Sequence, residues 1–318
     1  MPYKFKRSES VPEGIKRIVT EEIDSAVHEL ARGKNRDEAV HEARKSLKKI
    51  RGALRLVQPE LGRTYREENA QLGDIGRKLS EIRDATAIIE VFDGLLDRFR
   101  GDVHRSALTS IRRALERSKR ETEQALDVGN VIKQAAATLR SARKRVGKWP
   151  LENDGFKAIS GGLEERYRRG RKAMAAARKD PKPENYHEWR KRAKDHWYHV
   201  RLIEPVWTDI LEAREKSLKD LETWLGDDHN FVVLNERIKN EPEKFGDEKQ
   251  LTFFCALVSE HQNELRQNSM ALGERIYEEK PRHFTASLSK LWDAWQSDPE
   301  SLKKPPAASA SKKKTAAA

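Results

Sequence analysis

Two segments of the chain begin with a histidine and carry cations at helical spacing. The first is His41–Pro59 and the second is His187–Pro205. On a helical wheel of about 100° per residue, the cations of the first segment fall within roughly 60–80° of His41. They are Arg44, Lys45, Lys48, Arg51 and Arg55. Apolar residues fill the opposite arc, so the pattern predicts one helix with a core face and a cationic face.

A face with only positive charge favours an anionic ligand. Like charges at helical spacing repel each other, and ordinary solvated faces mix signs to avoid this cost. Arginine can contact phosphate through two N–H groups, and lysine supplies a point charge. His41 and His187, in the first turn of each expected helix, are placed to donate to an anion near a helix N-terminus. A purely solvated charged face remains the alternative.

The two segments are copies separated by 146 residues. Positions 41–61 and 187–207 share eight identical residues out of 21. The second copy carries Arg190, Lys191, Lys194 and Arg201, and Tyr198 joins its cationic face as a further candidate for ligand contact. The same offset pairs Lys144 with Lys290 and Leu79–Asp84 with Leu225–Asn230. Self-similarity of this kind indicates a duplicated fold, with halves at 1–150 and 151–298.

Helical periodicity extends through both halves, and no segment alternates at period two. The fold class is therefore all-α, with two pseudo-symmetric halves that each resemble a four-helix bundle. In the first half we expect helices near 12–31, 38–57, 63–79, 85–100, 103–126 and 131–146. In the second half we expect them near 156–178, 184–204, 206–225, 231–240, 248–278 and 282–296. Asp84 and Asn230 each precede an expected helix and would serve as N-caps.

Composition points to a soluble protein with a polyanionic partner. Charged residues make up 36%, the formal net charge is +12 and the pI is about 9.6. The single cysteine, Cys255, excludes an internal disulfide and suits a reducing compartment. No signal peptide or membrane span is expected, so we predict a cytoplasmic protein. Residues 299–318 are rich in Lys and Ala and are expected to be disordered.

Signals for catalysis or for a cofactor are weak. His196 and His199 supply two candidate metal ligands without a third. Neither the P-loop pattern nor the dinucleotide-binding glycine pattern occurs, and nothing marks a nucleophile. We therefore predict no catalytic residue, no metal and no cofactor.

The paired His-x-x-Arg helices, each followed by a Leu-Gly-x-x-Arg-Asp-like turn, resemble the CHAD domain, the conserved histidine α-helical domain. The resemblance covers about residues 10–296. It implies two four-helix bundles around a basic cavity that binds inorganic polyphosphate, at polyphosphate granules in bacteria. The positions it implies for polyphosphate contact are His41, Arg44, Lys48, Arg51, Arg55, His187, Arg190, Lys194 and Arg201. Lys45 and Lys191 lie beside them, and Lys144 and Lys290 are added from the repeat.

The chain departs from the family pattern at several places. Trp197 stands where the first half has Arg51, so the second stripe has one cation fewer. Ser80 replaces the usual glycine, and His229-Asn230 replaces the usual final pair of the turn. Some members also carry a CYTH domain, but its E-x-E-x-K signature is absent here.

Three functions remain open. The first is non-enzymatic binding of polyphosphate. The second is nucleic-acid binding, supported by the pI and by Trp189, Trp197 and Tyr198 among the cations. The third is phosphoryl cleavage, which needs a metal and carboxylates near the cations. Protein partners are not identified by the sequence.

Overall fold

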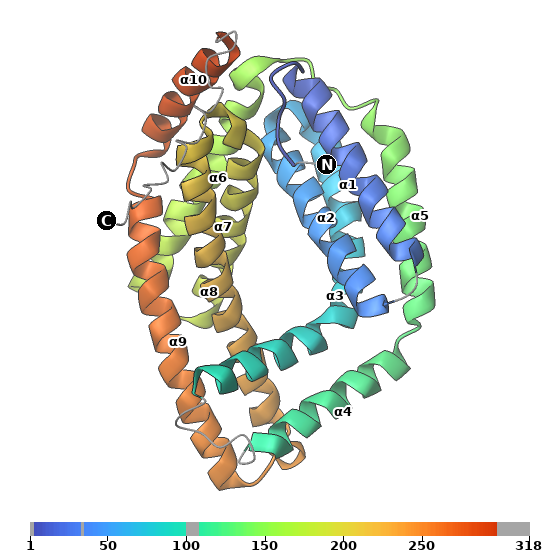
Figure 1. The fold of residues 1–318 in the computed structure, drawn as a ribbon, viewed down its shortest axis with the longest axis vertical. Helices are drawn as coiled ribbons and strands as arrows, with labels where there is room; N and C mark the ends of the chain where they lie inside the picture. The colour runs from blue at the N-terminus through green and yellow to red at the C-terminus, as the bar shows by residue number, and fades with distance from the viewer. Residues whose placement is uncertain (1–2, 33–34, 100–107, 298–318) are drawn as a thin grey trace, which may run out of the picture.

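The computed structural model describes residues 3–32, 35–99 and 108–297. This part of the chain is helical and contains no β-strand, which confirms the all-α class (Figure 1). Its α-helices are α1 (Val11–Arg32), α2 (Arg36–Leu56), α3 (Gln58–Arg98), α4 (Thr109–Ala125), α5 (Val128–Val146), α6 (Gly155–Lys179), α7 (Pro183–Ile203), α8 (Thr208–Asn240), α9 (Glu248–Ile276) and α10 (Pro281–Ser297). The expected disordered tail lies outside the described residues.

The helices form two groups at one end of the molecule and a shared layer at the other (Figure 1). One group contains α1, α2, α5 and the first part of α3, and the other contains α6, α7, α10 and the first part of α8. At the far end, α3 packs on α4 and α8 packs on α9. The order of helices in residues 11–146 is thus repeated in residues 155–297.

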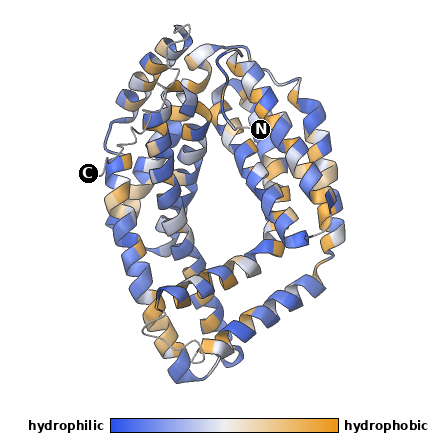
Figure 2. Ribbon diagram, viewed as in Figure 1, coloured by the Kyte–Doolittle hydropathy of each residue, from blue (hydrophilic) through white to orange (hydrophobic). Residues whose placement is uncertain are grey.

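Two hydrophobic clusters hold this arrangement together. The larger contains buried residues from α1, α2, α5, α6, α7 and α10, from the first parts of α3 and α8, and from the end of α9. The smaller, at the far end, contains residues of α4, of the first part of α9 and of the last parts of α3 and α8. Figure 2 shows the apolar residues interspersed with hydrophilic ones along the helices, as expected for faces that are buried on one side. Each cluster includes residues from both halves of the sequence.

α3 and α8 are continuous through the positions where breaks were expected. Asp84 lies inside α3, and Gly226 and Asn230 lie inside α8, so the predicted N-caps at Asp84 and Asn230 are wrong. A glycine within a helix costs only about 1 kcal/mol. Buried residues such as Leu218 and Phe231 hold α8 on either side of Gly226, and this packing outweighs the local preference. Gly62, by contrast, has a φ of 50° and kinks α3 near its start.

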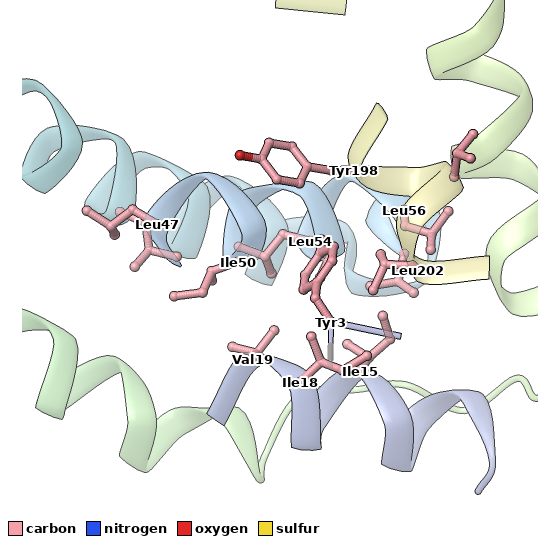
Figure 3. Packing of buried hydrophobic residues seen from close by; sticks show 14 of the residues in the cluster. Tyr3, Ile15, Ile18, Val19, Leu47, Ile50, Leu54, Leu56, Tyr198 and Leu202 are labelled. Atoms are coloured by element: carbon pink, nitrogen blue, oxygen red, sulfur yellow. The ribbon is translucent and has the colours of Figure 1, made fainter. Parts of the chain in front are cut away.

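α2 approaches its neighbours closely near its C-terminal end. A Cβ on Gly52 would lie 2.8 Å from the Cβ of Tyr198 on α7, and one on Gly162 of α6 would lie 1.9 Å from the Leu56 carbonyl oxygen. His199 Nε2 lies 3.1 Å from the Gly52 carbonyl oxygen. Figure 3 shows Tyr3 between α1 and α2, with Ile15 and Ile18 on one side and Leu54 on the other. The two groups of helices are therefore joined through α2.

No helix in the described part of the chain is long and apolar enough to cross a membrane.

The contact between α2 and α6 can be tested with Gly162→Ala. The added methyl group meets backbone atoms of Leu56 and Arg55, which cannot move without displacing α2. We expect a loss of about 3 kcal/mol or more in the free energy of unfolding, measured by urea denaturation. Gly161→Ala is the control, because its Cβ makes an ordinary 3.4 Å contact with Pro59 Cγ. Equal stability of the two variants would contradict the close approach.

Candidate anion-binding site

α2 and α7 converge at their C-terminal ends and diverge toward His41 and His187 (Figure 1). At the convergent end the predicted site residues are engaged in ion pairs. Arg55 NH1 lies 3.2 Å from Asp195 on α7, and Arg201 Nε lies 3.1 Å from Glu215 on α8. The Arg201 guanidinium also lies over the rings of Tyr3, Trp197 and Tyr198. These two arginines therefore join the helices as well as adding charge.

A cavity of about 180 Å³ lies between α2 and α3, further toward the open end. Leu47 and Leu72 supply apolar wall, and Gly73, Gly76 and Ser80 bring the α3 backbone close. Four cationic side chains line the cavity: Arg44, Lys48, Arg51 and Arg77. Three of them are predicted site residues, and the structure adds Arg77 from α3.

Among the described residues, two of the four cations of this cavity have no carboxylate partner, whereas Arg77 pairs with the exposed Asp74. Lys48 has no carboxylate within salt-bridge distance among the described residues, and Arg51 donates to the amide oxygen of Asn69 at 2.9 Å. Arg44 NH1 lies 3.3 Å from the Leu79 carbonyl oxygen and 3.4 Å from Asp84. Asp84, expected as a helix cap, is therefore a partner of the site.

Burial disfavours the charged forms of these groups. It lowers the pKa of Lys48 to about 7, aided by the charges of Lys194 and Arg44. It also lowers the pKa of Arg51 to about 10, and the like charge of Arg55 lowers it further. The pKa of Arg44 is lowered for the same reason. Because Lys194 belongs to α7, the cationic faces of α2 and α7 lie close enough to interact electrostatically.

The second half differs, because a buried carboxylate neutralises its cations. Glu222 on α8 is 7% exposed. Its Oε1 lies 2.5 Å from Lys194 Nζ and 3.6 Å from Arg190 NH2, and its Oε2 lies 3.2 Å from Lys219 Nζ. These charges lower the pKa of Glu222 to about 2 against the effect of burial, and burial lowers that of Lys194 to about 8. The carboxylate comes from the following helix, so the pattern of α7 alone does not reveal it.

The two histidines each contact a position 42 residues further along the chain, on the following helix. Arg83 Nε donates to His41 Nδ1 at 3.4 Å, and the rings of His187 and His229 lie with centroids 4.0 Å apart. Burial lowers the pKa of His41 and of His187, and lowers that of His229 to about 4. α2 begins at Arg36 and α7 at Pro183, so His41 and His187 lie beyond the free N–H groups, and their expected place in the first turn is wrong.

The remaining predicted residues are more peripheral. Lys45 and Lys191 are half exposed and pair with Glu42 and Glu188 three residues earlier. Lys144 on α5 and Lys290 on α10 are exposed on helices that pack against the outer side of each group (Figure 1). The structure therefore gathers the α2 and α7 cations and leaves these two lysines outside them.

Several aromatic and histidine side chains lie in the core instead. Tyr198 is 4% exposed and packs against Gly52 and Tyr3, and Trp189 is fully buried. Trp197 is partly buried, with Lys219 and Arg201 over its ring. His196 and His199 are fully buried, and burial holds both pKa values far below the usual one. No group of three or more metal-ligating side chains occurs in the described residues.

The fold and this site define an all-helical domain of repeated layout with cations facing one another at its centre. The family model described as the CHAD domain matches residues 17–239, including both His-led helices. The chain therefore belongs to the CHAD domain family, which confirms the resemblance seen in the sequence.

Solved structures agree with this fold. PptA from Streptomyces chartreusis is 11% identical with a TM-score of 0.53, and the match covers 85% of this chain and 98% of that one. The CHAD domain from the plant Ricinus communis is 14% identical with a TM-score of 0.52, covering 90% and 93%. At these identities the likeness concerns the fold. A comparison with curated proteins finds no match.

The destabilisation caused by burying the charged Lys48 side chain can be measured as a function of pH. Between its folded pKa of about 7 and its ordinary value of 10.5, the unfolded chain binds more protons at this position than the folded chain. Stability supplied by this site therefore rises with pH over that range. We expect Lys48→Met to be more stable than the wild type at neutral pH by roughly 1–3 kcal/mol. The difference should shrink toward pH of about 10.

Urea denaturation across this pH range measures the difference. Lys133→Met on α5 is the control, since Lys133 is exposed and its replacement should leave stability nearly unchanged at every pH. A Lys48→Met variant that is less stable than the wild type at neutral pH would contradict the desolvated state of Lys48.

Proposed function

We propose that this protein binds inorganic polyphosphate, without cleaving it, along the cationic faces of α2 and α7. The observation that carries the proposal is the cavity lined by Arg44, Lys48, Arg51 and Arg77, in which Lys48 and Arg51 have no carboxylate partner among the described residues. A ligand with several phosphates would neutralise charges that the protein leaves uncompensated. Membership of the CHAD domain family supports polyphosphate over a generic anion.

The geometry suits a linear ligand with closely spaced charges. Cations lie along α2 from Arg44 to Arg55, and Arg190 and Lys194 lie on α7 near enough to lower the pKa of Lys48. A polymer with a negative charge on each repeat unit can contact several of these groups at once. Each contact releases condensed counterions, so affinity should fall steeply as salt rises.

Binding is tested with the double variant Lys48→Gln/Arg51→Gln. Removing two contacts should weaken binding to polyphosphate at least about tenfold and lower the slope of log affinity against log salt by about 2. The measurement is a titration with polyphosphates of graded length at several salt concentrations.

The control is Lys133→Gln/Arg140→Gln, which removes the same two types of charge from exposed positions on α5. Both double variants should keep wild-type helicity by circular dichroism. If the α5 variant loses as much affinity as the α2 variant, net charge rather than this site governs binding.

The same titration separates polyphosphate from nucleic acid. Trp189 and Tyr198 are buried and offer no surface on which bases could stack. An equal-charge single-stranded nucleic acid should therefore compete only weakly. Phosphate release from the pure protein with Mg²⁺ or Mn²⁺ would instead indicate phosphoryl cleavage. The carboxylates near the cations are held in ion pairs, Asp195 with Arg55 and Glu222 with Lys194, which favours binding over metal-dependent chemistry.

We further propose that the protein localises to polyphosphate granules in cells that accumulate them. A fluorescent fusion of the wild type should form foci that coincide with polyphosphate staining. The Lys48→Gln/Arg51→Gln fusion should be diffuse, because its site is weakened, whereas the Lys133→Gln/Arg140→Gln fusion should still form foci. Foci that persist in cells unable to make polyphosphate would contradict the proposal.

A further inference from the structure

One pair of repeat-related positions sets the two halves of the site apart. Position 76 on α3 is glycine, and position 222 on α8, which is 146 residues later, is glutamate. A Cβ at Gly76 would meet no atom within 4 Å, so the first half has open space at this point. The same place in the second half is filled by a buried carboxylate.

Glu222 occupies the position that an anion would take among the second-half cations. Its carboxylate contacts Lys194 and Arg190. Their repeat partners, Lys48 and Arg44, line the open cavity beside Gly76. Charge-assisted contacts of a carboxylate with these donors resemble those that a phosphate oxygen would make. The second half thus has a buried carboxylate at this position, whereas the first half has none there.

We infer that Glu222 is a specificity-determining residue that fills one phosphate position of the second half and so leaves α2 and α3 as the strong half of the site. This inference rests on the proposed function. A short polyphosphate binds first in the cavity beside Gly76. A longer chain reaches Lys194 and Arg190 only where its oxygens displace the Glu222 carboxylate.

Two reciprocal substitutions test the inference. Glu222→Gln removes the resident charge, and affinity for long polyphosphate should rise about three- to tenfold, with a smaller gain for tripolyphosphate. Gly76→Glu adds a carboxylate beside Arg44 and Lys48, and affinity for both ligands should fall at least about tenfold. Gly76→Gln is the matched control, because it adds the same side-chain bulk and helix propensity without charge.

A second control separates local from global charge. Asp24 and Arg143 form an exposed ion pair between α1 and α5, at 2.5 Å. Asp24→Asn changes net charge by the same amount as Glu222→Gln and should leave affinity within about twofold of the wild type. A misfolded protein cannot yield the tighter binding expected for Glu222→Gln. If Glu222→Gln does not fold, the comparison of Gly76→Glu with Gly76→Gln still decides the inference.

Thermal unfolding without ligand tests the charge arrangement independently of polyphosphate. Glu222→Gln should lower Tm, because Lys194 and Arg190 lose their buried partner, and Gly76→Glu should raise Tm relative to Gly76→Gln. If the wild type fails to retain polyphosphate at low salt while these Tm shifts appear, the proposed function fails and the charge arrangement stands. If the wild type binds but Glu222→Gln matches Asp24→Asn and Gly76→Glu matches Gly76→Gln, the inference is overturned.

Discussion

The structure depends on the contact between α2 and α7 near Gly52, which brings two positively charged helices together. Gly52 allows the Tyr198 ring to pack against the α2 backbone, and His199 lies against the Gly52 carbonyl oxygen. The larger hydrophobic cluster surrounds this contact and supplies the free energy that opposes the repulsion of the cations. Burial lowers the pKa values of Lys48 and Lys194, and the repulsion from neighbouring cations lowers them further. Apolar packing therefore holds the charges where a ligand can use them.

Much of the fold was predictable because it follows from periodicity and duplication. The all-α class and the positions of α2 and α7 came from apolar residues at helical spacing. The continuity of α3 and α8 was not predictable from Asp84, Gly226 and Asn230, since local propensity there favours a break. Burial at both ends of each helix decides the outcome, and burial depends on partners that lie far away in the sequence.

The candidate site was predicted in part. The helical wheel placed Arg44, Lys48 and Arg51 on one face, and the structure brings them into one cavity. The wheel could not place Tyr198, because a face that looks cationic in isolation is partly covered by Tyr3 from the N-terminal segment. Arg77 and Glu222 were missed because they lie on the following helices. Aligning Gly76 with Glu222 at the 146-residue offset was the one available signal for the difference between the halves.

The two hydrophobic clusters have a consequence for the ancestry of the fold. Each cluster draws residues from both halves of the chain, so neither half can bury its apolar surface alone. A protein made of one repeat would reach this arrangement only by pairing with a second copy, and in such a homodimer every position is identical in both subunits. Joining the copies in one chain removes that restriction. The open space at Gly76 and the buried carboxylate of Glu222 are then a difference between the two halves that a homodimer could not have encoded.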